Sequence, residues 1–191
     1  MPDSGVPASI GYAEKIKKNI ELGIIRNHYV GRTFIEPSQQ IRSLGVKLKH
    51  SINKTLVKNK SLTLIDDSLV RGTTSVKIVK MLYEAGAKEV HLKIASPPIK
   101  YPDYYGVDTP NQNELLASKF DIEGMRRFIN ATTLQFLSLE GHYKSMGYEK
   151  RNSSYPQFTD HCFTGEYPIK PIDAHDKDFI NDQLSLMSSK Y

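Results

Sequence analysis

The stretch that most constrains the fold of this chain is residues 62–74, Leu-Thr-Leu-Ile-Asp-Asp-Ser-Leu-Val-Arg-Gly-Thr-Thr. A short apolar run ends in two adjacent carboxylates, Asp66 and Asp67, and a turn containing Gly72 leads into apolar residues at helical spacing. This order predicts a strand, a loop and a helix. Because ligands of open α/β sheets bind beyond the carboxyl ends of the strands, the loop is the expected ligand site.

The residue types in this loop suit a phosphate at one end of a ligand and hydroxyl groups or a cation at the other. Free backbone N–H groups and the dipole at the start of a helix attract an anion, and Gly72 allows a close approach of the backbone. The hydroxyls of Ser68, Thr73 and Thr74 can donate hydrogen bonds. Two carboxylates repel phosphate but suit sugar hydroxyls or Mg²⁺. A ribose 5-phosphate fits both halves, and an ordinary strand-ending turn followed by an N-cap cluster is the structural alternative.

As a whole, the run 62–74 is similar to the phosphoribosyl pyrophosphate (PRPP) signature of type I phosphoribosyltransferases, and its ending resembles the amidophosphoribosyltransferase version. It is not a P-loop, because the Gly-Lys-Ser/Thr ending is missing. The resemblance implies an α/β fold, with a central, mostly parallel sheet flanked by helices and with one or more N-terminal strands missing. It also implies that PRPP is bound by Asp66, Asp67, Ser68, Leu69, Val70, Arg71, Gly72, Thr73 and Thr74.

The opening residues resemble a second element of the same family, its pyrophosphate loop Val-Pro-Asp-Ser-Gly, with Met1 in place of the valine. The resemblance implies that Asp3, Ser4 and Gly5 contact PRPP. It also implies a Mg²⁺ site to which Ser4 contributes together with the two carboxylates, Asp66 and Asp67. Taken without the resemblance, Ser4 would be assigned to hydrogen bonding at the entry of a helix.

Residues 23–37 have no sustained period and contain two glycines, which favours a mobile loop or a surface crossover. Residues 26–42 resemble the family's flexible loop, which closes over PRPP and lines an ammonia channel. Closure would protect an activated sugar from water. The resemblance implies a role there for Tyr29, Arg32 and Ile35.

The Pro- and Tyr-rich stretch 96–110 is long for a loop in a compact domain, and such loops are often functional. It follows a predicted strand and should lie on the same rim as the 66–74 loop. The resemblance implies a surface for a nucleobase and a feedback purine nucleotide, to which Asp108 and Pro110 would contribute with Arg26. A purely structural proline-rich loop is the alternative.

Periodicity predicts helices over 7–22, from 73 to 86, and over 114–119, 122–129 and 138–146, and strands over 46–48, 90–95 and 134–137. A core over 1–147 and an extension over 148–191 are the expected domains. The extension is expected to pack on the core or to be partly disordered, and the polar composition of 148–161 favours disorder there. The length of 191 residues allows one domain with an extension.

Composition narrows the class of protein. The net charge is +5, but the basic residues are scattered among 21 acidic ones, which argues against a nucleic-acid-binding stripe. No apolar run is long enough to span a bilayer, so no membrane partner is expected. The single cysteine fits a reducing compartment, and we expect a cytoplasmic protein.

Two features depart from the family. Some members hold a 4Fe–4S cluster through four cysteines, but here Asp103 and Thr159 occupy cysteine positions and only Cys162 is retained. One thiolate cannot hold such a cluster, so we expect none and interpret Cys162 as a small buried apolar residue. Full-length members also begin with a glutaminase domain, and this chain has no N-terminal cysteine for that chemistry. A C-terminal fragment is the simplest interpretation.

The resemblance implies phosphoribosyl transfer from PRPP to ammonia, which gives 5-phosphoribosylamine in the first step of purine biosynthesis. The ammonia comes from glutamine in the full-length enzyme, which we expect to be a homo-oligomer. Three alternatives remain: a salvage purine phosphoribosyltransferase, which the match over 26–42 disfavours; a non-enzymatic PRPP sensor; and a fragment without activity.

Overall fold

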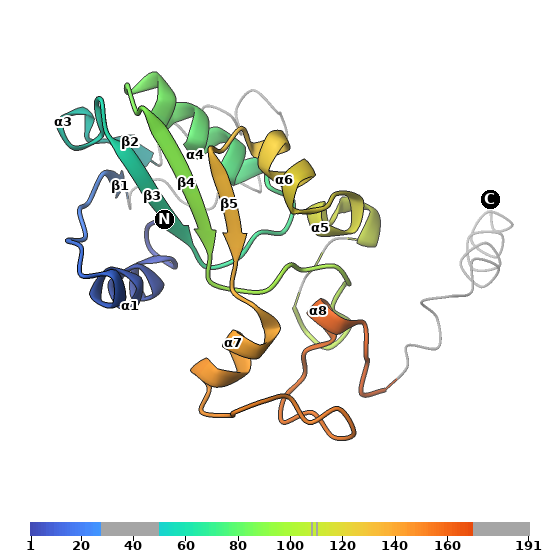
Figure 1. Cartoon of the computed structure of the whole chain (residues 1–191). Helices are drawn as coiled ribbons and strands as arrows, with labels where there is room; N and C mark the ends of the chain where they lie inside the picture. Colours follow the sequence, from blue (N-terminus) through green and yellow to red (C-terminus); the bar gives the residue numbers. More distant parts are fainter. Residues whose placement is uncertain (28–49, 108, 110, 170–191) are drawn as a thin grey trace, which may run out of the picture.

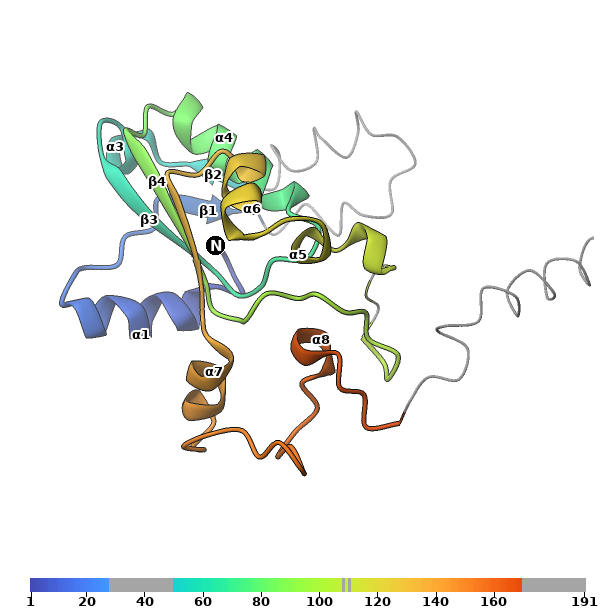
Figure 2. The same cartoon turned by 45° about the vertical axis from the view of Figure 1, so that its right-hand side comes forward.

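A three-stranded parallel sheet forms the centre of the computed structural model, which describes residues 1–27, 50–107, 109 and 111–169. The strands are β3 (Ser61–Asp66), β4 (Glu89–Ile94) and β5 (Thr133–Phe136), in the order β3–β4–β5. Helices α4 (Thr73–Glu84) and α6 (Ile122–Ile129) lie side by side on one face of the sheet (Figures 1 and 2). The α/β class and the parallel sheet predicted from the sequence are confirmed.

The core lies between this sheet and the two helices. In β4 the side chains of Val90, Leu92 and Ile94 are buried in strict alternation, as the period-2 pattern of the sequence predicts. Leu62 of β3 pairs with Val90, and Leu92 pairs with Leu134 of β5, so the apolar sets of the three strands face the same side. The helices complete the cluster with the buried residues Ile78, Val79, Leu82, Met125 and Ile129.

The remaining elements surround this core. A two-stranded antiparallel sheet is formed by β1 (Ile24–Arg26) and β2 (His50–Ile52), with Ile25 opposite Ser51. The helical elements outside the α4–α6 layer are α1 (Val6–Ile16), α3 (Lys54–Val57), η2 (Gln112–Glu114), α5 (Leu116–Lys119), α7 (Leu139–Ser145) and α8 (His161–Thr164). No helix in the described part of the chain is both long and apolar enough to cross a bilayer.

Two predictions near the N-terminus were wrong. The first helix ends at Ile16 and not at residue 22, because Lys17 takes a left-handed conformation (φ 53°) and caps the helix through its backbone N–H. Residues 24–26, interpreted as part of a loop, form β1, because a two-stranded pairing needs only a short segment and a distant partner. The strand predicted over 46–48 lies outside the described residues.

The segment 148–161 was expected to be disordered, and this expectation was wrong. It contains no regular element before α8, but it is fixed to α7: the ring of Phe158 stacks on Tyr143 at 4.3 Å. Asp160 is buried at 2% exposure, where it accepts hydrogen bonds from Tyr143 Oη (2.8 Å) and Arg151 Nε (2.6 Å). Polar composition did not reveal this, because the polar groups satisfy one another inside the fold. The division into 1–147 and 148–191 stays a prediction.

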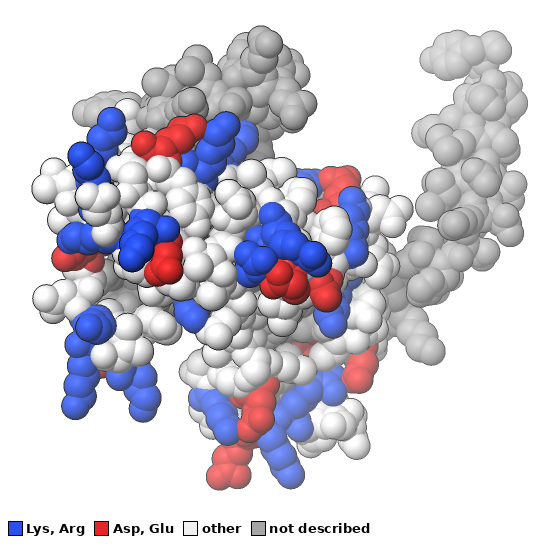
Figure 3. Space-filling model, turned by 45° about the horizontal axis from the view of Figure 1, so that its top comes forward, with Lys and Arg blue, Asp and Glu red and all other residues white. Residues whose placement is uncertain are grey.

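Charged side chains of both signs are intermixed on the face shown in Figure 3. Among the described residues, Arg126 pairs with Glu123 at 2.6 Å and Lys144 pairs with Glu140 at 2.7 Å. Exposed pairs of this kind contribute little to stability, but they offset the net positive charge locally.

Candidate functional site

The loop between β3 and α4 is held in a fixed shape by contacts at its base. Gly72 takes a left-handed conformation (φ 76°), and α4 begins at Thr73 directly after it. A Cβ at Gly72 would lie 2.8 Å from Leu116 Cδ2, so a larger residue would collide there. The backbone N–H of Leu116 donates to the carbonyl of Val70 at 2.8 Å, which ties the loop to α5. Leu69 is buried at 3% exposure and anchors the loop in the core.

The start of α4 has the features of an anion cradle. Its 12 residues align the peptide dipoles, and its first N–H groups have no partner within the helix. Thr73 is exposed and Ser68 and Thr74 are half-buried, so the three hydroxyls predicted to donate to a phosphate are at least partly accessible. Because the side chain of Leu69 points into the core, only its backbone could reach a ligand in the loop.

The two consecutive carboxylates lie in different environments. Asp66 is 6% exposed at the end of β3, whereas Asp67 is exposed. The backbone N–H of Asp67 donates to Asp66 Oδ1 at 3.1 Å. Burial raises the pKa of Asp66 to about 7, and the neighbouring Asp67 carboxylate adds to the rise. A cation close to this carboxyl group would stabilise its ionised form and lower its pKa.

Residues 1–5 lie against the end of β3, beside Asp66. A Cβ at Gly5 would stand 2.6 Å from the carbonyl oxygen of Ile65, so only glycine allows this contact. The structure therefore brings the predicted pyrophosphate segment Asp3-Ser4-Gly5 to the same rim as the 66–74 loop, although more than 60 residues separate them.

Arg26, predicted for a nucleotide surface, forms an ion pair with Asp3: its Nη1 lies 2.6 Å from Asp3 Oδ2. The exposed fractions of the two side chains are 31% and 53%, so the pair is accessible to solvent. The other residues assigned to that surface, Asp108 and Pro110, lie outside the described residues. So do the residues assigned to the lid and ammonia channel, Tyr29, Arg32 and Ile35.

The sequence analysis did not predict the contact between the 66–74 loop and η2. Arg71 Nε donates to Glu114 Oε2 at 2.8 Å, which links the loop to η2. The two residues are 43 positions apart, and no spacing rule connects them. A mostly apolar cleft of about 500 Å³ was missed as well; it lies between α1 and the edge of β3, and the 66–74 loop does not line it.

No protein-family model matches the chain. Among curated proteins, the amidophosphoribosyltransferase of Rhizobium etli is 54% identical over 190 residues, which cover 99% of this chain and 38% of that protein. The chain belongs to the amidophosphoribosyltransferase family. The enzyme of Bacillus subtilis is 52% identical over 170 residues, and the chloroplastic amidophosphoribosyltransferase 2 of Arabidopsis thaliana is 51% identical over 187. The chain spans between about a third and two fifths of the length of these amidophosphoribosyltransferases.

Two solved structures share the fold of this chain. The glutamine PRPP amidotransferase of B. subtilis, complexed with ADP and GMP, matches 87% of this chain and 36% of its own, with 51% identity and a TM-score of 0.76. A structure described as the allosteric regulatory enzyme of purine biosynthesis matches 91% of this chain and 37% of its own, with 47% identity and a TM-score of 0.74. The type I phosphoribosyltransferase fold predicted from the sequence is confirmed.

Proposed function

We propose that this chain binds PRPP at the 66–74 loop, and that the complete protein transfers the phosphoribosyl group to ammonia to give 5-phosphoribosylamine in purine biosynthesis. The observation that carries the proposal is the junction of β3 and α4. There a helix N-terminus behind a left-handed Gly72 and the carboxylates of Asp66 and Asp67 lie on one rim. Amidophosphoribosyltransferases more than 50% identical over most of this chain support the same reaction.

Each half of the loop binds a different part of PRPP. The backbone N–H groups and hydroxyls of residues 68–74 receive the 5-phosphate, because the helix dipole and several donors converge there. Asp67, which is exposed, accepts hydrogen bonds from the ribose hydroxyls. Asp3, Ser4 and Gly5 receive the pyrophosphate, since they lie beside the end of β3 where the sugar carbon would be placed.

A Mg²⁺ ion fits the oxygen donors on this rim. Asp66 is buried with a raised pKa, and a cation nearby would offset the cost of its ionisation. We assign Ser4, Asp66 and Asp67 as the residues that would hold the ion together with PRPP. When bound, Mg²⁺ supplies positive charge that stabilises pyrophosphate as a leaving group.

The protein contributes placement and charge complementarity, and the reaction needs no protein nucleophile. Ammonia forms a bond to the anomeric carbon as the bond to pyrophosphate breaks, and the nitrogen then loses a proton. The phosphate cradle and the carboxylates hold the two ends of the sugar, so the anomeric carbon is fixed toward the incoming ammonia. We assign Tyr29, Arg32 and Ile35 to the lid over this carbon, where they exclude water.

Purine nucleotides are the proposed inhibitors of the complete protein, and the proposed nucleotide surface comprises Arg26, Asp108 and Pro110. The B. subtilis amidotransferase, which was solved with ADP and GMP, supports a nucleotide of this class. We also propose that the complete protein is a homo-oligomer and obtains its ammonia from glutamine.

Calorimetric titration of the chain with PRPP and Mg²⁺ tests the proposal, with Asp67→Asn compared to the wild type. We expect binding heat from the wild type and at least a tenfold loss of affinity in the variant. Glu84→Gln is the matched control: it removes the same charge at the other end of α4, roughly 17 Å away along the helix axis. Equal affinities for wild type and Asp67→Asn would overturn the assigned role, and ammonia-dependent turnover would exclude a sensor without activity.

A further inference from the structure

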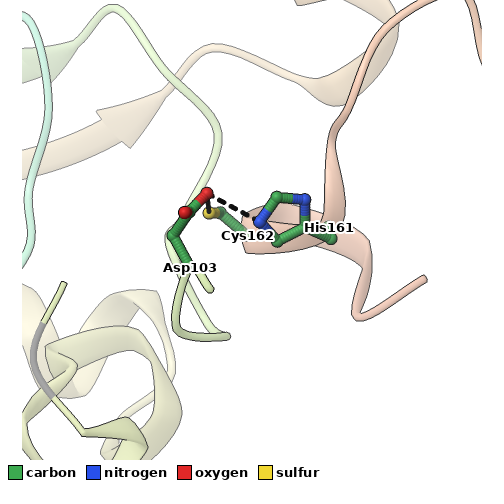
Figure 4. A group of neighbouring side chains, drawn as sticks. All are labelled: Asp103, His161 and Cys162. Carbon is green, nitrogen blue, oxygen red and sulfur yellow. Dashed lines mark hydrogen bonds and ion pairs between the residues drawn. The ribbon is translucent and has the colours of Figure 1, made fainter. Parts of the chain in front are cut away.

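Three side chains that can bind a metal ion converge where the 96–107 loop meets α8 (Figure 4). His161 Nε2 lies 2.8 Å from Asp103 Oδ2, and Cys162 Sγ lies 3.8 Å from the same oxygen. One ligand atom from each residue lies within 4.8 Å of the others. His161 is 3% exposed, and the side chain of Asp103 is 9% exposed. The interpretation of Cys162 as a small buried apolar residue misses this setting, because the thiol is half-buried against a carboxylate.

The surrounding contacts hold this cluster in place. Asp103 Oδ1 accepts hydrogen bonds from the backbone N–H groups of Tyr105 (2.7 Å) and Val107 (3.2 Å), which leaves Oδ2 to face the histidine and the cysteine. The carbonyl of Cys162 accepts from the backbone N–H groups of Lys100 and Tyr101 at 2.9 and 3.1 Å. Outer contacts of this kind orient metal ligands before the ion arrives.

The aromatic rings of Tyr105 and Tyr167 each lie 5.0 Å from the His161 ring, measured between ring centroids. Tyr167 Oη also donates to the carbonyl of Pro102 at 2.8 Å, so the ring is fixed on the loop. The imidazole therefore has little freedom to turn away from Asp103 and Cys162. A rigid set of ligands loses less entropy when it binds an ion.

We propose that Asp103, His161 and Cys162 form a mononuclear Zn²⁺ site that joins the 96–107 loop to α8. One oxygen, one imidazole nitrogen and one thiolate are a ligand set that Zn²⁺ accepts, and water completes the fourth position. Tetrahedral Zn²⁺ with bonds of about 2.0–2.3 Å separates its ligand atoms by roughly 3.3–3.8 Å. The observed separation of Sγ and Oδ2 already fits, and the shorter contact between Nε2 and Oδ2 opens by about half an ångström on this geometry.

Protons are released as the three bonds to the ion form. The Cys162 thiol loses its proton to solvent and becomes the thiolate ligand. In a neutral His161 the ring changes tautomer: the proton leaves Nε2, which faces Asp103, and Nδ1 takes up a proton from solvent, so the ring gives no net proton; Nδ1 has no hydrogen-bond partner among the described residues. One proton is thus released for each ion bound by the neutral histidine, and the affinity rises with pH.

The same cluster is unsuited to nucleophilic catalysis by the thiol. In a cysteine–histidine pair the imidazole must accept the thiol proton, but here the thiol hydrogen faces Asp103, and the histidine also bonds Asp103. Burial and the Asp103 carboxylate raise the pKa of Cys162 to about 11, which keeps the thiol protonated in the absence of a cation. A metal ion reverses this balance by stabilising the thiolate.

Titration of the metal-free chain with Co²⁺, a spectroscopic substitute for Zn²⁺, tests the proposal. Cys162 is the only cysteine of the chain, so a thiolate-to-metal charge-transfer band can come only from this residue. We expect the band to saturate at one Co²⁺ per chain and to disappear when Zn²⁺ is added. Absence of the band in the wild type, or a band whose strength per chain depends on protein concentration, would overturn the proposal.

Variants assign the other two ligands. Asp103→Asn and His161→Ala should weaken Co²⁺ binding at least tenfold, whereas His91→Ala on β4 should bind as the wild type does. Circular dichroism checks that each variant folds. A measurement without mutation is the rate at which an alkylating reagent modifies Cys162 in the wild type, which bound Zn²⁺ should lower. Unchanged affinity in a folded His161→Ala variant, or no protection by Zn²⁺, would contradict the site.

Discussion

Asp66 and Asp67 follow each other at the end of β3, yet the first is buried at 6% exposure and the second faces solvent. Asp66 is the last residue of β3 and lies beside residues 1–5, whereas Asp67 is the first residue of the loop, so the two carboxylates do not share one environment. Burial raises the pKa of Asp66 to about 7. Asp67 is therefore the accessible carboxylate of the pair, and Asp66 is a buried group whose charge depends on pH near neutrality.

The buried carboxyl group of Asp66 should make stability depend on pH. Its folded pKa lies above its unfolded value, so the native state binds more protons between about pH 4 and pH 7, and the free energy of unfolding falls as pH rises through that window. The variant Asp66→Asn removes this pH-dependent contribution to the free energy of unfolding, which amounts to about 1.4 kcal/mol per unit of pKa shift. We expect the variant to be more stable than the wild type at pH 8, with the advantage lost at pH 5. Urea denaturation at both pH values measures it, and parallel pH profiles would contradict it.

The same group should make PRPP binding depend on pH. Mg²⁺ and sugar hydroxyls require the ionised carboxylate, so the affinity for PRPP with Mg²⁺ should fall as pH drops below about 7, by up to about tenfold per pH unit. Calorimetry at pH 6, 7 and 8 measures the effect. The phosphate groups of PRPP also titrate. In Asp66→Asn, the remaining pH dependence of the PRPP affinity should come from these phosphates alone. If both proteins show the same pH profile, Asp66 takes no part in binding.

Gly72→Ala should destabilise the chain. The substitution places a Cβ 2.8 Å from Leu116 Cδ2 and 3.3 Å from Phe128 Cε1, at a residue with φ 76°. Strain and overpacking together should cost about 1–3 kcal/mol of unfolding free energy. Gly11→Ala in α1 is the matched control, because its Cβ meets nothing within 4 Å, and it should stabilise the helix by about 0.5–1 kcal/mol. Urea denaturation of both variants checks the opposite signs; a neutral Gly72→Ala would show that the loop adapts.

Tyr143→Phe should loosen the 148–169 segment. The variant removes the hydroxyl that donates to Asp160 Oδ2 at 2.8 Å and leaves a buried carboxylate with one donor fewer, at a cost of about 1–3 kcal/mol. Tyr155→Phe is the control, because Tyr155 is 82% exposed. Limited proteolysis of 148–169 and urea denaturation measure the difference, and equal behaviour of the two variants would contradict it.

Acid should weaken the contacts that Asp160 makes with Tyr143 and Arg151. Burial alone would raise the pKa of Asp160, but hydrogen bonds from Arg151 and Tyr143 hold it below its usual value. A depressed folded pKa contributes stability that is present above the unfolded pKa and is lost as pH falls through the folded one. The free energy of unfolding should therefore drop below about pH 4 in the wild type and drop less in Asp160→Asn.

Local patterns in the sequence were sufficient for the elements that form the sheet layer. The alternation of Val90, Leu92 and Ile94 predicted β4, and the helical spacing after Gly72 predicted α4, because both elements bury one face against the same core. Local patterns failed at α1, β1 and the 148–161 segment. There the structure depends on a left-handed residue, on a distant strand partner and on buried polar contacts that composition does not reveal.

The sequence by itself determined the α/β class, the strand–loop–helix unit around Gly72 and the family, because these depend on periodicity and on a contiguous motif. Only the tertiary structure decided that Asp66 is buried while Asp67 is exposed, that residues 1–5 adjoin the end of β3, and that Asp103 meets His161 and Cys162. The physical reason is that burial and contact arise between segments distant along the chain. Packing brings such segments together, and the spacing of residues along the sequence does not predict which segments will meet.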